Sequence, residues 1–236
     1  MIETQSPEIF EIQETSTKQE RKFGELILTD FLNMDEEDQF DFRRKVVGSN
    51  GTVQIWIHSH YNETGDTSPK SEEYKQIRDK ALSSINPENI PVLSFIEAPP
   101  GFEWNIDEYG KMYSKLMKGK VYVIPTFQDT SVPCIENTED LFVRKHETEI
   151  KNWDILGSKL AQMGVTKVIV RGRNFEYATK PIEKMSLAED IYAENNKLSG
   201  DTVTVPDKCA GNAVVQLSAR GFEILSTRVT YPEKLK

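Results

Sequence analysis

Residues 153–170 read WDILGSKLAQMGVTKVIV, an amphipathic helix followed by a glycine and then by an apolar strand. In the helical part the large apolar side chains recur three or four positions apart, as on one helix face: Trp153, Leu156, Leu160 and Met163. Gly164 is typical of the position just past a helix C-terminus. The run VTKVIV is rich in β-branched residues and predicts a buried strand.

The same alternation of helix and strand recurs on both sides of this stretch. Apolar runs predict strands at Leu26–Leu28, Thr52–His60, Pro91–Ile96, Lys120–Phe127 and Phe222–Val229. Helical spacing and start signals predict helices at 36–47, Ser71–Ile85, Ile106–Met117 and Cys209–Arg220. Near-continuous apolar strands separated by helices are typical of a mostly parallel sheet with both faces covered. We therefore predict one doubly wound α/β domain over residues 23–236, a Rossmann-like three-layer sandwich with helices on both faces.

Two segments depart from this alternation. Residues 1–22 are polar and without sustained periodicity, and we expect a polar N-terminal tail. Residues 174–207 separate a predicted strand from its following helix by far more than the usual two to six positions. Such an insertion lies at the carboxyl ends of the strands, where open α/β sheets bind ligands. We expect it to be a lid or an arm for homo-oligomerisation.

The composition restricts the partners that the chain can have. In 236 residues, 29 Lys and Arg stand against 38 Asp and Glu, which gives a net charge of −9. This balance weighs against nucleic acid and against an anionic membrane surface as partners. We find no signal peptide and no apolar run long enough to span a bilayer, and the two cysteines make no disulfide framework. We expect a cytoplasmic protein that binds a small-molecule substrate or ligand.

Cys209 is the first candidate for chemistry, because it begins the last predicted helix in the segment Pro206-Asp-Lys-Cys-Ala-Gly-Asn212. Free backbone N–H groups and the helix dipole at such a position lower a thiol pKa and favour the nucleophilic thiolate. Ala210 and Gly211 are small, so a substrate oxygen could bind their N–H groups as in an oxyanion hole. The alternative is a buried, structural cysteine at a helix start.

The stretch 154–229 resembles the second half of the isochorismatase-like cysteine hydrolases. It reads LGSKLAQMGVTKVIVRG and, after the insertion, CAGNAVVQLSARGFEIL. Cys209 and the pair Gly221-Phe222 match the spacing of that family's catalytic cysteine and Gly-aromatic pair. Lys145, in Leu141-Phe-Val-Arg-Lys145, resembles the family's lysine in placement. The resemblance implies hydrolysis of a small amide or ester, with Cys209 as nucleophile and Lys145 holding it as a thiolate.

The chain departs from the family at the catalytic aspartate, which the family carries at the end of its first strand. If the first strand is Leu26–Thr29, Asp30 takes that place and completes the triad. If the first strand is Thr52–Ile57, the position is His58 and the triad is incomplete. The insertion at 174–207 is also much longer than the family's loop.

His58 and His60 are a candidate metal pair at the end of the most pronounced strand. Two histidines at i and i+2 on a strand point to one face, as zinc ligands can. The context IHSHYNETGDTSPKSEEY resembles the metal motif of JAMM metalloproteases, with Ser68 at the matching spacing. The aspartate expected three residues later is Ser71, and the proline expected after the second histidine is Tyr61. The alternative is a hydrogen-bonded pair at a strand end, and zinc is the one cofactor that we consider.

A third candidate site follows the strand VTKVIV, where Arg171, Arg173 and Asn174 could clamp a carboxylate or phosphate. Thr126, Gln128 and Thr130 end the neighbouring predicted strand and could line the same cleft. The alternative is a surface charge pair in an acidic chain. The sequence has no G-x-G-x-x-G after a strand and no P-loop motif, so a dinucleotide or P-loop site is not expected.

Three functions thus remain open from the sequence. The first is a cysteine hydrolase with Cys209, Lys145 and Asp30 as catalytic residues. The second is a non-catalytic relative of the same fold that binds a ligand or a protein through the insertion. The third is a zinc hydrolase centred on His58 and His60.

Overall fold

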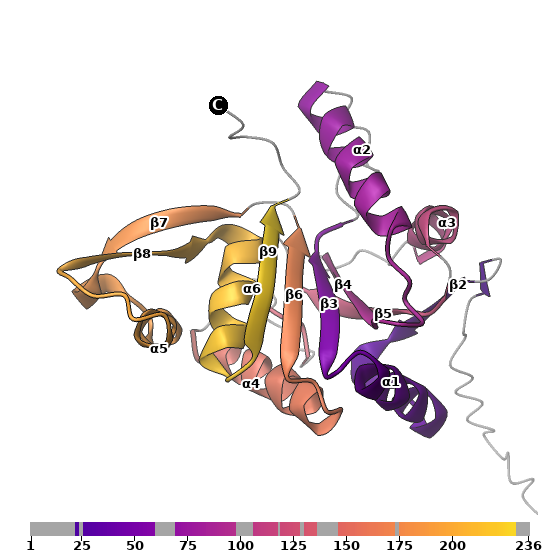
Figure 1. Cartoon of the computed structure of the whole chain (residues 1–236), viewed down its shortest axis with the longest axis horizontal. Coiled ribbons are helices and arrows are strands. Elements are labelled where there is room, and N and C mark those ends of the chain that lie inside the picture. Colours follow the sequence, from indigo (N-terminus) through magenta and orange to yellow (C-terminus); the bar gives the residue numbers. More distant parts are fainter. Residues whose placement is uncertain are drawn as a thin grey trace, which may run out of the picture.

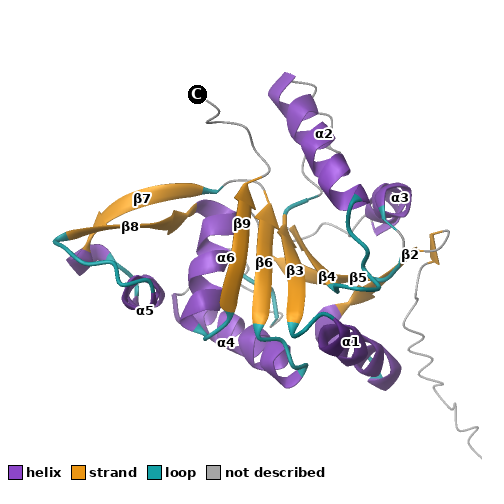
Figure 2. Cartoon of the chain, in the orientation of Figure 1, coloured by secondary structure: helices purple, strands orange, loops and turns teal. Residues whose placement is uncertain are grey.

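A computed structural model describes residues 22–23, 26–59, 69–97, 106–117, 119–127, 130–135, 146–172 and 175–229. Its strands are β1 (Lys22–Phe23), β2 (Leu26–Asp30), β3 (Thr52–Ile57), β4 (Val92–Glu97), β5 (Val121–Thr126), β6 (Lys167–Gly172), β7 (Glu176–Pro181), β8 (Thr202–Asp207) and β9 (Glu223–Val229). Its α-helices are α1 (Glu36–Gly48), α2 (Pro69–Ser83), α3 (Ile106–Leu116), α4 (His146–Gln162), α5 (Leu187–Asn195) and α6 (Lys208–Ala219). Two short 3-10 helices, η1 (Phe31–Asn33) and η2 (Ile182–Lys184), complete the described elements. Strands and helices alternate along the chain (Figure 2).

The central sheet has the strand order β1-β2-β5-β4-β3-β6-β9. Six of these strands, β2 to β9 in that order, pair in parallel, and only the two-residue β1 pairs antiparallel with β2. Each parallel pair needs a crossover connection, and the helices supply it. The predicted doubly wound, mostly parallel α/β fold is confirmed.

Two clusters of buried side chains form the core, one on each face of the sheet. On one face, side chains of α1, α4 and α6 pack on the sheet, and the cluster includes Phe42, Trp153 and Leu217. On the other face, Leu82 of α2 and Tyr113 of α3 pack beside Trp56 and Val121. Strand β3 is buried along its whole length, as its unbroken apolar run predicts. The molecule therefore has three layers, with the sheet in the middle.

The middle of this sheet contains a topological switch point. Strand β3 continues into α2 on one face, whereas β6 leads, through the insertion, to α6 on the other face. In open α/β sheets, ligands bind outside the carboxyl ends of the strands at such a point. The adjacent ends of β3 and β6, at Ile57 and Gly172, mark this place.

The insertion is an ordered unit beside the central sheet. Strands β7 and β8 pair antiparallel in a separate two-stranded sheet, from Glu176 opposite Asp207 to Pro181 opposite Thr202. Helix α5 lies between the two strands in sequence and packs against α6. Figure 1 shows β7 and β8 extending away from the main sheet with α5 beside them.

Two predicted boundaries differ from the observed ones by three residues or more. The strand predicted over Thr52–His60 ends at Ile57, because His58 adopts a left-handed backbone conformation with φ of 54°. The helix predicted to start at Trp153 begins earlier, at His146. In both places the local composition continues the neighbouring pattern, so the sequence carries no boundary signal.

Candidate functional site

His58 lies at the centre of a polar cluster formed by the carboxyl ends of β3, β4 and β5. Its Nε2 donates a hydrogen bond to the carbonyl oxygen of Thr130 at 2.9 Å and lies 3.3 Å from Oγ1 of Thr126. Its Nδ1 lies 3.6 Å from the carboxylate of Glu97, the last residue of β4. Thr126 and Thr130 thus lie around the buried His58, and a cleft that they share with Arg171, Arg173 and Asn174 stays a prediction.

The environment of His58 keeps its imidazole uncharged at neutral pH. The side chain is 1% exposed, and burial lowers the pKa to about 4, against a smaller opposing effect of the hydrogen bond to Thr130. Histidine tolerates the left-handed backbone better than most residues, and strained conformations of this kind concentrate at functional sites. His58 is therefore a neutral, fixed group whose one N–H is donated to Thr130, so that its Nδ1 can only accept a hydrogen bond.

Two hydrogen bonds, one to Thr130 and one to the next residue, Ser131, connect His58 to the first turns of α6. Thr130 is followed by Ser131, whose hydroxyl accepts a hydrogen bond from the Asn212 amide at 3.3 Å. Asn212 lies three residues after Cys209 on the same helix. From α4, Asn152 donates to the carbonyl oxygen of Pro133 at 2.8 Å and holds the other end of this loop. The loop 130–135 therefore links β3, α4 and the start of α6.

Cys209 is the second residue of α6, as its sequence context predicts. The preceding residue, Lys208, has φ of 63°, so the chain makes a tight left-handed turn between β8 and the helix. The Cys209 side chain is half-buried against the core cluster of the α4 and α6 face. The thiol is thus fixed at the amino end of a helix, where backbone N–H groups lack intrahelical partners.

The two small residues after Cys209 have a packing role. Ala210 is 2% exposed. A Cβ added to Gly211 would lie 2.8 Å from the carbonyl carbon of Pro206, at the end of β8. Glycine at this position lets α6 approach the end of β8. A role for their backbone N–H groups toward a substrate stays a prediction.

Asp30 ends β2, the strand at the far side of β5 from the centre of the sheet. Its Oδ1 accepts a hydrogen bond from the backbone N–H of Leu32 at 2.9 Å, and its Oδ2 accepts one from the Asn33 amide at 2.7 Å. Both bonds cap the short helix η1. The strand next to β6 is β3. The residue at the carboxyl end of this central strand is therefore His58, whereas Asp30 lies at the end of β2.

Arg171 and Gly172 end β6 at the switch point. The guanidinium carbon of Arg171 lies 5.5 Å from the centre of the Trp56 ring, a cation–π arrangement across the two central strands. Gly172 has φ of 152°, and a Cβ there would lie 2.5 Å from the carbonyl oxygen of Ile57. The glycine is therefore required for the close approach of β6 to β3.

A second polar cluster lies beneath the α2 and α3 layer. The hydroxyl of Ser59 lies 2.6 Å from the Tyr113 hydroxyl and 3.1 Å from that of Ser94, which also contacts Tyr113. The buried guanidinium of Arg78 donates to the Ser59 carbonyl oxygen at 3.1 Å and to Asp79 at 2.6 Å. These bonds fix the chain directly after His58. The cluster is enclosed, because Ser59, Ser94 and Tyr113 are at most 1% exposed.

Several predicted site residues lie outside the described part of the chain: Lys145, His60, Gln128, Arg173 and Asn174. For the metal pair, the premise that both histidines lie on a strand is wrong at His58, which follows the strand. The described residues contain no group of three or more His, Cys, Asp and Glu side chains that could hold a metal ion.

Sequence reasoning missed Glu97, Ser131 and Asn212, which are spread over three segments with no motif between them. Of the three, only Glu97 has a signal in the sequence, because it ends an apolar strand, where open α/β sheets place ligand-site residues. No family model, no curated protein and no solved structure matches the chain. Among the helices of the described residues, none has the length and apolar character needed to cross a membrane.

Proposed function

We propose that the protein is a cysteine hydrolase of the isochorismatase-like type that acts on a small amide or ester, with Cys209 as its nucleophile. The observation that carries the proposal is the position of Cys209 at the amino end of α6, behind a left-handed turn at Lys208. The hydrogen bonds from Asn212 through the loop 130–135 to His58 connect this helix start with the carboxyl ends of the central strands. Helix N-termini and strand ends of this kind favour anions and reacting oxygens.

The proposed reaction has two steps. In the first, the Cys209 thiolate attacks the substrate carbonyl carbon, the bond from that carbon to the nitrogen or oxygen of the leaving group breaks, and the departing amine or alcohol takes a proton from water, so that a thioester remains on the enzyme. Backbone N–H groups at the start of α6 stabilise the negative oxygen of the tetrahedral intermediate. In the second step water attacks the thioester, the acid leaves and the thiol is restored. Lys145, by resemblance to the family, favours the thiolate through its charge.

The test compares the two cysteines of the chain. Burial raises the pKa of the Cys134 thiol, which makes it a suitable internal control. At about pH 6.5, iodoacetamide should modify Cys209 faster than Cys134, because a helix N-terminus lowers a thiol pKa. Lys145→Ala should slow the reaction at Cys209 and leave Cys134 unchanged. Equal rates at both cysteines would contradict the proposal.

Activity is measured with a panel of small amides and esters. Cys209→Ser should keep the fold, as judged by circular dichroism and thermal unfolding, and abolish the turnover found with the native protein. Cys134→Ser, the matched control, should retain it. Turnover that persists in Cys209→Ser would exclude Cys209 as the nucleophile.

The second candidate function is ligand binding without catalysis on the same fold. The placement of Asp30 on β2, beside the edge strand β1 and with both carboxylate oxygens in the cap of η1, favours this alternative. It predicts that compounds stabilise the native protein and Cys209→Ser equally, with no turnover by either. A thermal-shift screen of small carboxylates and amides distinguishes the two candidates, because hydrolysis products appear only in the first case.

A further inference from the structure

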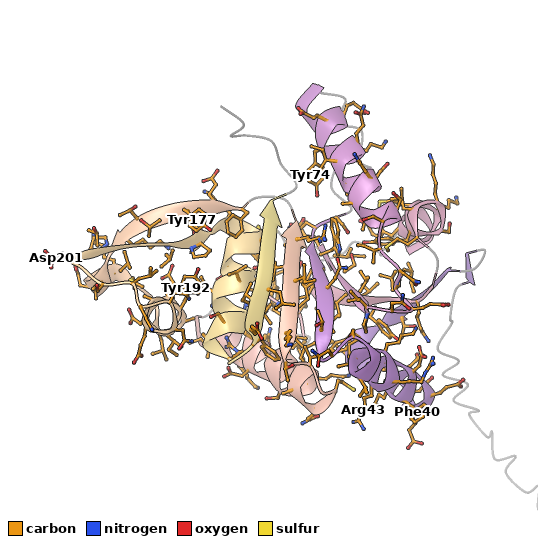
Figure 3. The ribbon with its side chains drawn as sticks, viewed as in Figure 1. Phe40, Arg43, Tyr74, Tyr177, Tyr192 and Asp201 are labelled. Carbon is orange, nitrogen blue, oxygen red and sulfur yellow. The ribbon has the colours of Figure 1, made fainter. Side chains whose placement is uncertain are left out.

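Helix α1 carries an exposed apolar stripe on the side that faces away from the sheet. Phe40 is 71% exposed and Val47 is 78% exposed, and their separation of about two turns places them on the same helix face. Phe42 and Val46 of the same helix point inward and are completely buried. Figure 3 shows Phe40 and Arg43 on the outer side of α1, at the periphery of the molecule. The Phe40 ring therefore adds little to the core of the single chain and is accessible to a partner.

Charged side chains surround Phe40 symmetrically and with opposite sign. Glu36 and Glu37 precede it by four and three residues, and Arg43 and Arg44 follow it by three and four residues. All four side chains are exposed. At about 100° per residue, Glu36 and Arg43 lie on one flank of Phe40, and Glu37 and Arg44 lie on the other flank. The outer face of α1 thus has an acidic half and a basic half with an aromatic ring between them.

Most of this charge is not neutralised within the chain. Among the described residues, no ion pair involves the two glutamates or Arg43, whose Nε donates to Sδ of Met163 at 3.4 Å. Arg44 does have a partner, Asp41, at 2.7 Å, but that carboxylate is shared with Lys45. The helix dipole favours acids at the start of a helix and bases at its end, and this accounts for the order of the charges. It does not account for the exposed aromatic ring between them.

We propose that the outer face of α1 binds the same face of a second copy of this chain, with the two helices antiparallel and the twofold axis beside Phe40. The two Phe40 rings then meet at the centre of the contact. A twofold rotation reverses the helix direction but keeps each flank on its own side, so Glu36 lies opposite Arg43 of the other copy. On the second flank, Glu37 lies opposite Arg44 of the other copy. A parallel arrangement would instead bring like charges together.

A second copy is the occupant that this face fits, because the face is complementary to itself in both charge and shape of pattern. Twofold contacts between identical patches are the commonest in soluble homo-oligomers. Exposed charge pairs mainly select the arrangement, here the antiparallel one, and add little affinity. A contact of one helix with one helix is smaller than a standard interface, so we expect a weak, reversible dimer. The contact does not involve Cys209 and is independent of the proposed hydrolase activity.

Sedimentation velocity of the full chain measures the self-association. Over a range of about 5–500 µM, where weak dimers form, the native chain should shift from monomer toward dimer. About 1 M NaCl should weaken the dimer, because salt screens exposed charge pairs. A native chain that stays monomeric over the whole concentration range would overturn the proposal.

Charge exchange tests the antiparallel arrangement itself. The double variant Arg43→Glu, Arg44→Glu has only acids on this face, and the double variant Glu36→Arg, Glu37→Arg has only bases. Each alone should dimerise at least about tenfold more weakly than the native chain, because like charges then face each other. An equal mixture of the two should dimerise again, since every acid meets a base. Both variants stay net negative, because the native chain carries −9, so general attraction between them cannot explain such a result. Native-like dimers of either variant alone, or no association in the mixture, would overturn the arrangement.

The central ring is tested separately. Phe40→Ala should weaken dimerisation by at least about tenfold, because the buried centre of the contact is lost. Leu187→Ala is the matched control, since Leu187 is a 68% exposed apolar residue on α5, and it should dimerise as the native chain does. Circular dichroism and thermal unfolding should show both variants folded, because neither side chain is buried. An equal effect of the two variants on dimerisation would overturn the role of Phe40.

Discussion

Gly172→Ala should destabilise the fold strongly, because Gly172 lies opposite Ile57 and an added Cβ would collide with β3. Its φ of 152° is a conformation that residues with a side chain rarely adopt. A Cβ at this position would also lie 2.5 Å from the carbonyl oxygen and 2.8 Å from the Cβ of Ile57. Both atoms belong to the partner strand, since Ile57 is directly opposite Gly172 in the β3–β6 pair.

The expected loss has two parts. A side chain in this backbone region costs about 1–3 kcal/mol. Overpacking against a rigid neighbour adds about 1–3 kcal/mol, because the first atom met is a backbone oxygen in a fully buried strand and cannot rotate away. The free energy of unfolding should therefore fall by between about 2 and 6 kcal/mol in total.

Equilibrium unfolding in urea, followed by tryptophan fluorescence and circular dichroism, measures this loss. Gly48→Ala is the matched control, because Gly48 is the last residue of α1, and an added Cβ would meet no atom within 4 Å. It should leave stability unchanged within about 1 kcal/mol. If Gly172→Ala were as stable as Gly48→Ala, the close approach of β6 to β3 would be refuted.

Three further variants test other parts of the structure. Gly211→Ala should destabilise by about 1–3 kcal/mol in urea unfolding through its clash with Pro206, and native stability would contradict the close contact of α6 with β8. Because burial lowers the pKa of His58 from 6.5 to about 4, the unfolded chain binds the proton more readily than the folded chain between these values. Stability should thus fall as pH drops from about 6.5 to 4, by about 3 kcal/mol, and less so in His58→Gln; equal pH dependence in both would refute this account. Tyr113→Phe should cost about 1–2 kcal/mol, because Ser59 and Ser94 lose a buried partner, whereas exposed Tyr177→Phe, the control, should be neutral.

The sequence predicts the alternation of helices and strands because burial of the sheet on both faces requires apolar residues at recognisable spacings within each element. The fully buried strand β3 reads as one apolar run, and the apolar face of α4 repeats at helical spacing. The order of the strands in the sheet has no such local pattern in the sequence. The short apolar run of β2 and the longer one of β3 each fit a first strand, and only long-range packing places β3 beside β6 and β2 beside β5. The choice between Asp30 and His58 depends on that order.

The insertion shows a second limit. Strand β7 has no buried residue and no regular alternation of exposed with half-buried positions, so no apolar pattern in the sequence marks it. Helix α5 does have a signal in the sequence: Ser186 and Glu189 form a capping box, with each side chain bonding the other's backbone. The polar cluster of His58, Glu97 and Thr130 brings together residues from three segments, and no sequence spacing predicts these contacts.

The β7–β8 ribbon also affects the entropy cost of folding the chain. More than thirty positions separate the end of β6 from the start of α6, and closing so long a loop costs about 2 kcal/mol more conformational entropy than closing one of a few residues. Glu176 and Asp207 pair at the base of the ribbon, however, so the pairing of β7 with β8 brings those two ends together. The effective contact order of β6 and α6 then equals that of an ordinary short connection. A change in the length of the segment 182–201, which joins β7 to β8, should consequently preserve the folding route of the central sheet as long as the two strands still pair.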